Sequence, residues 1–162
     1  MVFALLSLLF SGAIFGFFYA WVSSTMWGLD AADPQVAIAA MQAMNASVRN
    51  AVFAPAFFGT PLVLLVTALA SRRASGAAAL AFAAAAVVYT LGGLILTLAV
   101  NVPMNEALAQ VTIPQDRAEA AAIWADYSPR WQVWNQVRTV ASGLALLLAG
   151  WGTWRLGRDS RG

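Results

Sequence analysis

The sequence predicts an all-α integral membrane protein, a four-helix bundle with two short external helices. Its 162 residues are 61% hydrophobic and only 10% charged, whereas a soluble domain carries roughly 25% charged residues. Four stretches reach the length of about 20 apolar residues that crosses a bilayer, and they cover residues 2–26, 51–70, 77–100 and 133–154. Arg138 is the one charge inside them. We therefore expect a single transmembrane domain over residues 1–162.

The distribution of arginine predicts the orientation of the chain. Arg72 and Arg73 lie between the second and third stretches, and Arg155, Arg158 and Arg161 crowd the C-terminal end. The other two connections are acidic on balance. Because cytoplasmic loops are rich in Arg and Lys, we expect an inner (plasma) membrane protein with both termini in the cytoplasm.

The composition also narrows the chemistry. The chain has no Cys and no His, which excludes thiolate nucleophiles, disulfides, Cys/His zinc sites and the usual imidazole base. The arginines are dispersed rather than gathered on a basic face, so we expect no nucleic-acid partner. We expect no cofactor and no metal. A copper(I) site on Met26, Met41, Met44 and Met104 is an alternative to methionine as adaptable core filler.

The first half of the chain combines an aromatic helix with a proline-marked one. Tyr19 lies within the first stretch, where a buried hydroxyl needs a partner. Asp33 and Pro34 have the character of an N-cap and a first helical residue. They predict a helix over residues 34–50 that continues into the second stretch, kinked by Pro55 and Pro61. Its polar stripe is Gln42, Asn45 and Arg49.

The second half carries polar residues at its predicted outer mouth. Thr97, Asn101 and Asn105 are in line at helical spacing, and Pro103 between them is expected to bend or end the membrane helix. A short external helix is expected over residues 114–126. Ser128 and Pro129 then predict the restart of a helix as N-cap and N1.

The segment from Trp131 to Arg138 is the most informative part of the chain. Trp131, Asn135, Arg138 and Ser142 fall on one helical stripe, and an unpaired Arg facing lipid is costly. The stripe should therefore face protein or a wet cavity. A similar pattern begins at Met41. It consists of a large apolar residue, Gln, a spacer, a second large apolar residue and Asn, and it leads to Arg49. We expect the two elements to form opposite sides of one site, in a chain built as a parallel repeat of two helical hairpins.

These residues carry a family resemblance. The matching pieces are Tyr19–Trp21 with Ser23 and Gly28-Leu29, Ala40-Met41-Gln42 with Met44-Asn45, Asn50 with Phe53, Asn101-Val102-Pro103-Met104-Asn105, and Trp131 with Trp134-Asn135 and Val137-Arg138. With these pieces in this order, the chain resembles the DUF1772 family, whose named members are the anthrone oxygenases. The resemblance implies a four-helix membrane protein. In the characterised branch it implies oxidation of anthrones to anthraquinones.

The residues can be assigned roles in such chemistry. An anthrone is a flat apolar tricycle whose anion reacts with O₂, so a protein needs an apolar slot, a cation for the oxyanion and a base. As catalytic residues we expect Arg138, Arg49 and Asp126, with Glu106 and Tyr127 as other possible bases. The expected substrate-binding residues are Asn135, Asn45, Asn101, Asn105, Trp131, Trp134, Tyr19, Phe53 and Gln42, and Phe57 is a further candidate for the apolar wall.

Two other classes of function remain open. One is a non-catalytic binder of quinone-like molecules or lipids that uses the same mouth. The other is a structural or interaction protein in which the polar cluster only joins helices.

Overall fold

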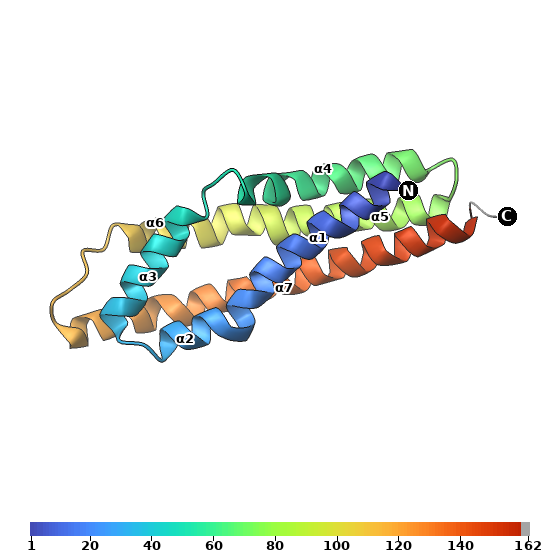
Figure 1. Ribbon diagram of the computed structural model, residues 1–162. Coiled ribbons are helices and arrows are strands. Elements are labelled where there is room, and N and C mark those ends of the chain that lie inside the picture. The colour runs from blue at the N-terminus through green and yellow to red at the C-terminus, as the bar shows by residue number, and fades with distance from the viewer. Residues whose placement is uncertain (160–162) are drawn as a thin grey trace.

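The computed structural model describes residues 1–159, and the described chain is helical with short connections (Figure 1). The α-helices are α1 Val2–Ala20, α2 Met26–Asp30, α3 Pro34–Ser47, α4 Phe53–Ser71, α5 Gly76–Tyr89, α6 Val102–Ala109 and α7 Arg117–Asp159. Three π-helical turns join some of them, η1 Trp21–Thr25, η2 Thr90–Ile95 and η3 Thr97–Asn101.

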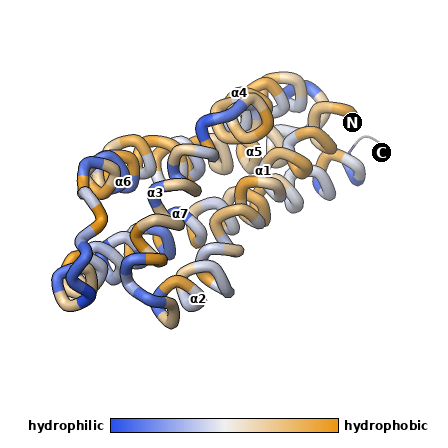
Figure 2. Tube along the Cα trace, turned by 60° about the vertical axis from the view of Figure 1, so that its left-hand side comes forward, coloured by the Kyte–Doolittle hydropathy of each residue, from blue (hydrophilic) through white to orange (hydrophobic). Residues whose placement is uncertain are grey.

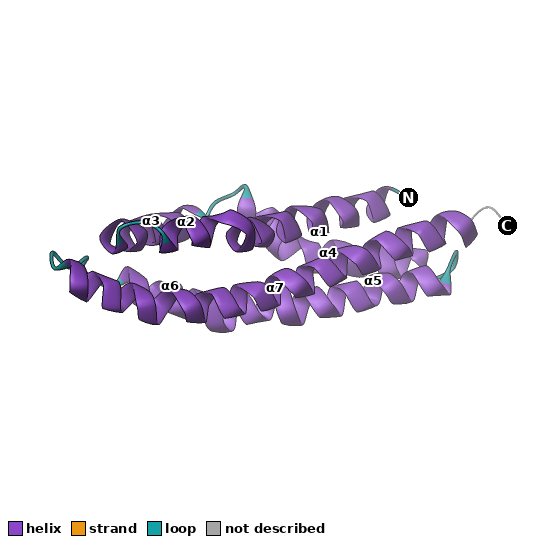
Figure 3. Ribbon diagram, turned by 90° about the horizontal axis from the view of Figure 1, so that it is seen from below, coloured by secondary structure: helices purple, strands orange, loops and turns teal. Residues whose placement is uncertain are grey.

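Four long helices form the bundle. α1 packs against α4 and α7, and α5 packs against the same two helices from the other side. The start of α1, the α4–α5 turn and the end of α7 lie together at one end of the molecule, whereas α2, α3 and α6 gather at the other (Figures 1 and 3). We call these the terminal end and the α3 end.

Apolar side chains cover most of the long helices. Within the described chain, three helical stretches are long and apolar enough to cross a membrane, Val2–Asp30, Phe53–Ser71 and Gly76–Ala109. Hydrophilic residues concentrate near the two ends of the bundle (Figure 2). The protein is thus a helical membrane bundle. The fourth expected span, 133–154, lies inside α7, which is not among the three stretches, and it stays a prediction.

The proline in the middle of α4 is compensated by a neighbouring helix. Pro61 has no N–H, so the carbonyl of Phe57 loses its intrahelical donor. The Tyr89 hydroxyl of α5 donates to this carbonyl at 2.9 Å. A freed carbonyl inside a membrane needs such a partner, and Tyr89 provides it while fixing α5 against α4.

The expected continuous helix from residue 34 to residue 70 is wrong. α3 ends at Ser47 and α4 begins at Phe53. The reason is Asn50, whose Nδ2 donates to the Ser47 carbonyl and whose Oδ1 accepts from the backbone of Val52 and Phe53. One amide therefore closes the first helix and opens the second. The expected start is correct, because Asp33 accepts from the Gln35 N–H as an N-cap.

The helix does not end at Pro103, since the third stretch runs through it to Ala109. Pro103 lies in the first turn of α6, where a missing N–H is tolerated, and the expected bend there stays a prediction. The expected restart at Ser128 is wrong. α7 runs unbroken through Ser128 and Pro129. Ser128 does not cap a helix, since its hydroxyl donates to Asp30 at 2.6 Å instead. At 1.5 Å per residue, this 43-residue helix is about 64 Å long.

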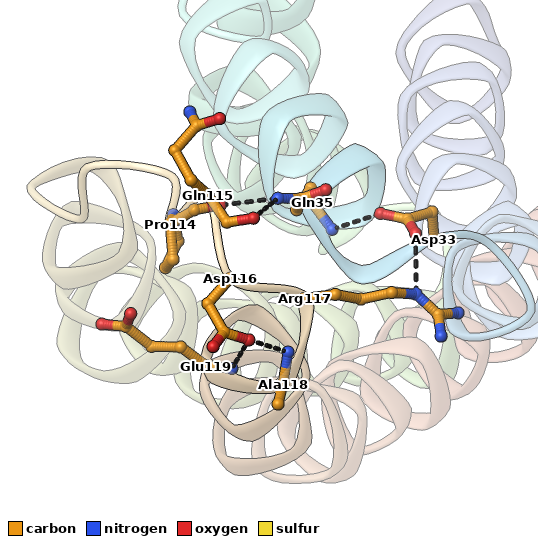
Figure 4. A network of polar contacts seen from close by, with 8 residues as sticks. All are labelled: Asp33, Gln35, Pro114, Gln115, Asp116, Arg117, Ala118 and Glu119. Atoms are coloured by element: carbon orange, nitrogen blue, oxygen red, sulfur yellow. Dashed lines mark hydrogen bonds and ion pairs between the residues drawn. The ribbon is translucent and has the colours of Figure 1, made fainter.

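Two contacts hold α3 against the loop before α7 (Figure 4). The Gln35 side-chain amide donates to the carbonyls of Pro114 and Gln115. Arg117 Nε pairs with the Asp33 carboxylate at 3.0 Å, and this pairing, together with the Gln35 N–H, holds the pKa of Asp33 below its usual value. These contacts fix the N-terminal end of α3, which forms one wall of the cavity described below.

Candidate functional site

A cavity of about 600 Å³ lies toward the α3 end of the bundle. Its aromatic lining is Phe17, Phe18, Trp21, Phe53, Phe57, Phe58 and Trp131, and its polar lining is Asn45, Arg49, Asn50, Thr97, Asn105, Glu106 and Arg138. The rings contact one another, with centroids 4.8 Å apart for Phe17 and Phe53 and 5.1 Å apart for Trp21 and Trp131. An apolar chamber with a few polar groups is the usual form of a small-molecule site.

Arg138 is the buried cation of this cavity. Its side chain comes from α7 and is only 4% exposed. Nε donates to Asn135 Oδ1 at 2.8 Å, and Cζ lies 4.4 Å from the ring centroid of Phe18 and 4.8 Å from that of Trp131. Within residues 1–159, no carboxylate pairs with it. The charge is therefore stabilised by an amide and two ring faces, and it is free to attract an anion.

The predicted inward stripe of α7 is confirmed. Trp131, Asn135 and Ser142 are each 1% exposed, and Arg138 lies between them on the same face. Asn135 also donates to the Phe18 carbonyl at 3.4 Å, so the residue that orients the guanidinium is itself attached to α1.

Arg49 reaches the same cavity from the turn between α3 and α4. It is exposed, and its Nη2 pairs with Glu106 Oε1 of α6 at 3.2 Å. A second cavity of about 480 Å³, which we call the vestibule, shares Asn45, Arg49, Asn105 and Glu106 with the first. The Arg49–Glu106 pair thus lies at the junction between the cavity and the vestibule. This side of the cavity is polar.

Asn105 connects α6 to α7 behind the cavity wall. Its Oδ1 accepts from the Tyr127 hydroxyl at 2.9 Å and from Trp131 Nε1 at 2.8 Å. Burial raises the pKa of Tyr127 above its usual value, so the phenol stays a donor. Asn105 therefore fixes the ring of Trp131, which in turn lies under Arg138.

Two other predicted amides are buried with unpaired atoms. Nδ2 of Asn45 has no hydrogen-bond partner among the described residues, and neither has Oδ1 or Nδ2 of Asn101. Asn45 lines the cavity, whereas Asn101 lies below the surface and is fully buried. An unpaired buried amide is costly, and the Asn45 side chain also interacts with the Tyr127 phenol.

The structure does not bring the remaining predicted residues into the cavity. Tyr19 is half exposed and stacks on Phe15, and Trp134 points outward from α7. Asp126 is exposed and pairs with Arg130 at 3.6 Å. Gln42 lines only the vestibule, where its amide donates to the Leu108 and Val111 carbonyls and closes the end of α6.

Sequence reasoning missed Phe18 and the contacts of Asp30. Asp30 accepts from Trp124 Nε1, Ser128 Oγ and Gln132 Nε2. These three donors recur every four residues, so their shared face on α7 was visible in the sequence, but their acceptor 94 or more residues away was not. Phe18 carried no distinguishing signal among nine Phe residues.

The four methionines of the alternative copper(I) site lie in or against one apolar cluster. Among the described residues, no group of three or more His, Cys, Asp or Glu side chains could hold a metal ion. Met26 and Met41 are buried in an apolar cluster with Trp124 and Trp131, and Met44 and Met104 pack against it. This is the arrangement expected of core filler.

Comparison with known proteins gives one match. The family model described as anthrone oxygenase matches residues 41–148, which is more than half of the chain and includes every polar residue that lines the cavity. No curated protein and no solved structure matches. With this match, the chain belongs to the anthrone oxygenase family.

Proposed function

We propose that the protein oxidises a flat hydroxylated aromatic compound of the anthrone type with O₂, inside the cavity beside Arg138. The observation that carries this proposal is the Arg138 guanidinium, which lies over the rings of Phe18 and Trp131 at the cavity and has no carboxylate partner among the described residues. A buried cation of this kind stabilises negative charge that develops on a substrate oxygen. Flat rings fit between aromatic side chains.

The reaction needs a proton acceptor and a stabilised anion. Loss of a proton from the ring CH₂ gives an anion whose charge lies largely on the carbonyl oxygen, beside Arg138. The anionic carbon forms a bond to O₂, and protonation gives a hydroperoxide. Elimination of water then leaves C=O, so that CH₂ and O₂ become C=O and H₂O, with one oxygen atom in each product.

Glu106 is the carboxylate best placed to accept the proton. It lines the cavity, whereas Asp126 is exposed outside it and pairs with Arg130. Arg49 contacts Glu106 Oε1 and leaves the other carboxylate oxygen for the substrate. We therefore propose Glu106 in place of Asp126 as the base and Arg49 as the residue that positions it.

The distribution of charges also supports an orientation. Arg72, Arg73, Arg155 and Arg158 all belong to the terminal end of the bundle, and the positive-inside rule places such an end in the cytoplasm. In this orientation the cavity and the vestibule face the outer side of the inner (plasma) membrane.

A turnover assay tests the proposal. Protein in lipid nanodiscs is mixed with a hydroxylated anthrone, and O₂ uptake and quinone absorbance are followed together, with empty nanodiscs as the background. We expect one O₂ consumed per quinone, and at least a tenfold slower reaction in Glu106→Gln than in the exposed control Glu119→Gln. A wild-type rate no higher than that of empty nanodiscs would refute the enzymatic function.

A second candidate is a binder without turnover. It is favoured by the Arg49–Glu106 pair, because Oε1 of the proposed base is already held by a cation. A hydroxylated anthraquinone would then quench the tryptophan fluorescence and raise the melting temperature without any O₂ uptake from the anthrone. A purely structural protein would give neither signal.

A further inference from the structure

We propose that the cavity takes its ligand sideways from the bilayer, and that this ligand carries an apolar tail which leaves the cavity between Phe58 of α4 and Leu98 of η3. The inference rests on the proposed function, because it uses the same cavity and the same anion-binding end at Arg138. It adds the class of substrate, an amphiphile with a hydroxylated ring as its polar end.

The cavity has two edges of opposite character. Arg49, Asn50 and Glu106 form a charged and amide-rich edge next to the vestibule. Phe58 and Leu98 also line the cavity, and they are 50% and 47% exposed. A side chain that both lines a cavity and reaches the surface marks its edge, so the second edge is apolar.

The apolar edge belongs to membrane-crossing segments. Phe58 lies within the stretch Phe53–Ser71 and Leu98 within Gly76–Ala109, both long and apolar enough to cross a membrane. Exposed side chains on such helices face hydrocarbon. Phe58 comes from α4 and Leu98 from the η3 turn, so two different segments bound the apolar edge, and the proposed tail passes between them.

The Phe58 side of the apolar edge lies deeper in the bundle than the charged edge. Phe58 is five residues farther into α4 than Phe53, which corresponds to about 7.5 Å in the direction of the terminal end. Arg49, four residues before Phe53, lies on the opposite side near the vestibule. A ligand with its acidic oxygen at Arg138 and its tail past Phe58 therefore directs that tail toward the terminal end, in the same sense as the lipids around it.

The physical chemistry of the tail gives a distinctive signature. Lipid chains are as apolar as the side chains of a membrane helix, so moving a tail from lipid to the groove gains little hydrophobic free energy. The tail acts by concentrating the ligand in the bilayer. The binding rate should then follow the mole fraction of ligand in the membrane and not its concentration in water.

The experiment uses two probes, a hydroxylated anthraquinone with an octyl substituent and the same compound without it. Binding to the full chain in liposomes is followed by the quenching of tryptophan fluorescence in a stopped-flow instrument. Leu98→Trp narrows the proposed opening. Leu91→Trp is the matched control, because Leu91 is similarly exposed on η2 but does not line the cavity, and both variants add one indole.

We expect Leu98→Trp to slow binding of the octyl compound at least tenfold and Leu91→Trp to change it less than twofold. Phe58→Ala, which widens the same opening, should speed it. Adding lipid at constant total ligand should slow binding in proportion to the dilution within the membrane. If the rate follows the aqueous concentration, or if both tryptophan variants behave as wild type, sideways entry is overturned.

The two proposals fail in different ways. If the unsubstituted compound still raises the melting temperature of the wild type, ligand binding at Arg138 stands although sideways entry has failed. If neither compound produces a shift or quenching, the proposed function itself fails, and the inference fails with it.

Discussion

Arg138 and Asn135 are three residues apart on α7, and the Arg138 Nε–H donates to Asn135 Oδ1 at 2.8 Å. This bond uses one of the five N–H donors of the guanidinium and fixes its plane over Phe18 and Trp131. The four Nη–H donors remain on the far edge. Since Asn135 is itself held by the Phe18 carbonyl, the cation is oriented before any ligand arrives.

The first prediction concerns the shape of this cation. Arg138→Lys keeps the charge but loses the planar fork and its stacking on the rings, so we expect the affinity for a hydroxylated anthraquinone to fall at least tenfold. The measurement is the ligand-induced shift in melting temperature. The control is Arg130→Lys, an exposed residue paired with Asp126 outside the cavity. Equal shifts in wild type and Arg138→Lys would show that the fork is not used.

The second prediction concerns the two donors that meet at Asn105. Asn105→Leu leaves the Tyr127 hydroxyl and Trp131 Nε1 without their acceptor, and each unpaired buried donor costs about 1–3 kcal/mol. We expect a clear fall in melting temperature and a shift of tryptophan emission. Asn105→Asp retains an acceptor oxygen, so its melting temperature should fall much less. The idea is wrong if leucine and aspartate destabilise the bundle equally.

The third prediction concerns pH. Because Arg117 and the Gln35 N–H lower the pKa of Asp33, the charged form stabilises the fold. That stabilisation is present above the unfolded pKa of about 3.9 and is lost as the pH falls through the lower folded value. Asp33→Asn keeps an N-cap acceptor but removes the charge. We expect its melting temperature to lie below that of wild type at pH 6 and to converge with it in strong acid; a gap that persists unchanged to pH 2 would count against this account.

The fourth prediction concerns orientation. The chain has no cysteine, so single cysteines report sidedness without background. Ala74 in the α4–α5 turn and Ala31 after α2 are both exposed, whereas Ser75 is buried, caps α5 and contacts Asp159. In intact cells, Ala31→Cys should react with an impermeant thiol reagent and Ala74→Cys should not. The reverse labelling would place the cavity on the cytoplasmic side.

Helix periodicity was sufficient to predict the inward face of α7 from Trp131 to Ser142, because the cost of a lipid-facing charge leaves one orientation for Arg138. It was not sufficient to find helix ends. Asn50 ends α3 and begins α4 through contacts within three residues, whereas Ser128 has a local cap signal that a distant partner, Asp30, overrides. For the same reason Glu106, next to Arg49 in space but 57 residues away in sequence, could not be ranked above Asp126.

The place of α7 in the chain has a consequence for biosynthesis. It follows α1, α4 and α5, so the ribosome makes Arg138 after the helices that surround it in the fold. The partner amide of Asn135 lies on the same helix and emerges just ahead of it. The groups that shield this charge, the amide of Asn135 and the rings of Phe18 and Trp131, therefore all leave the ribosome before the charge does.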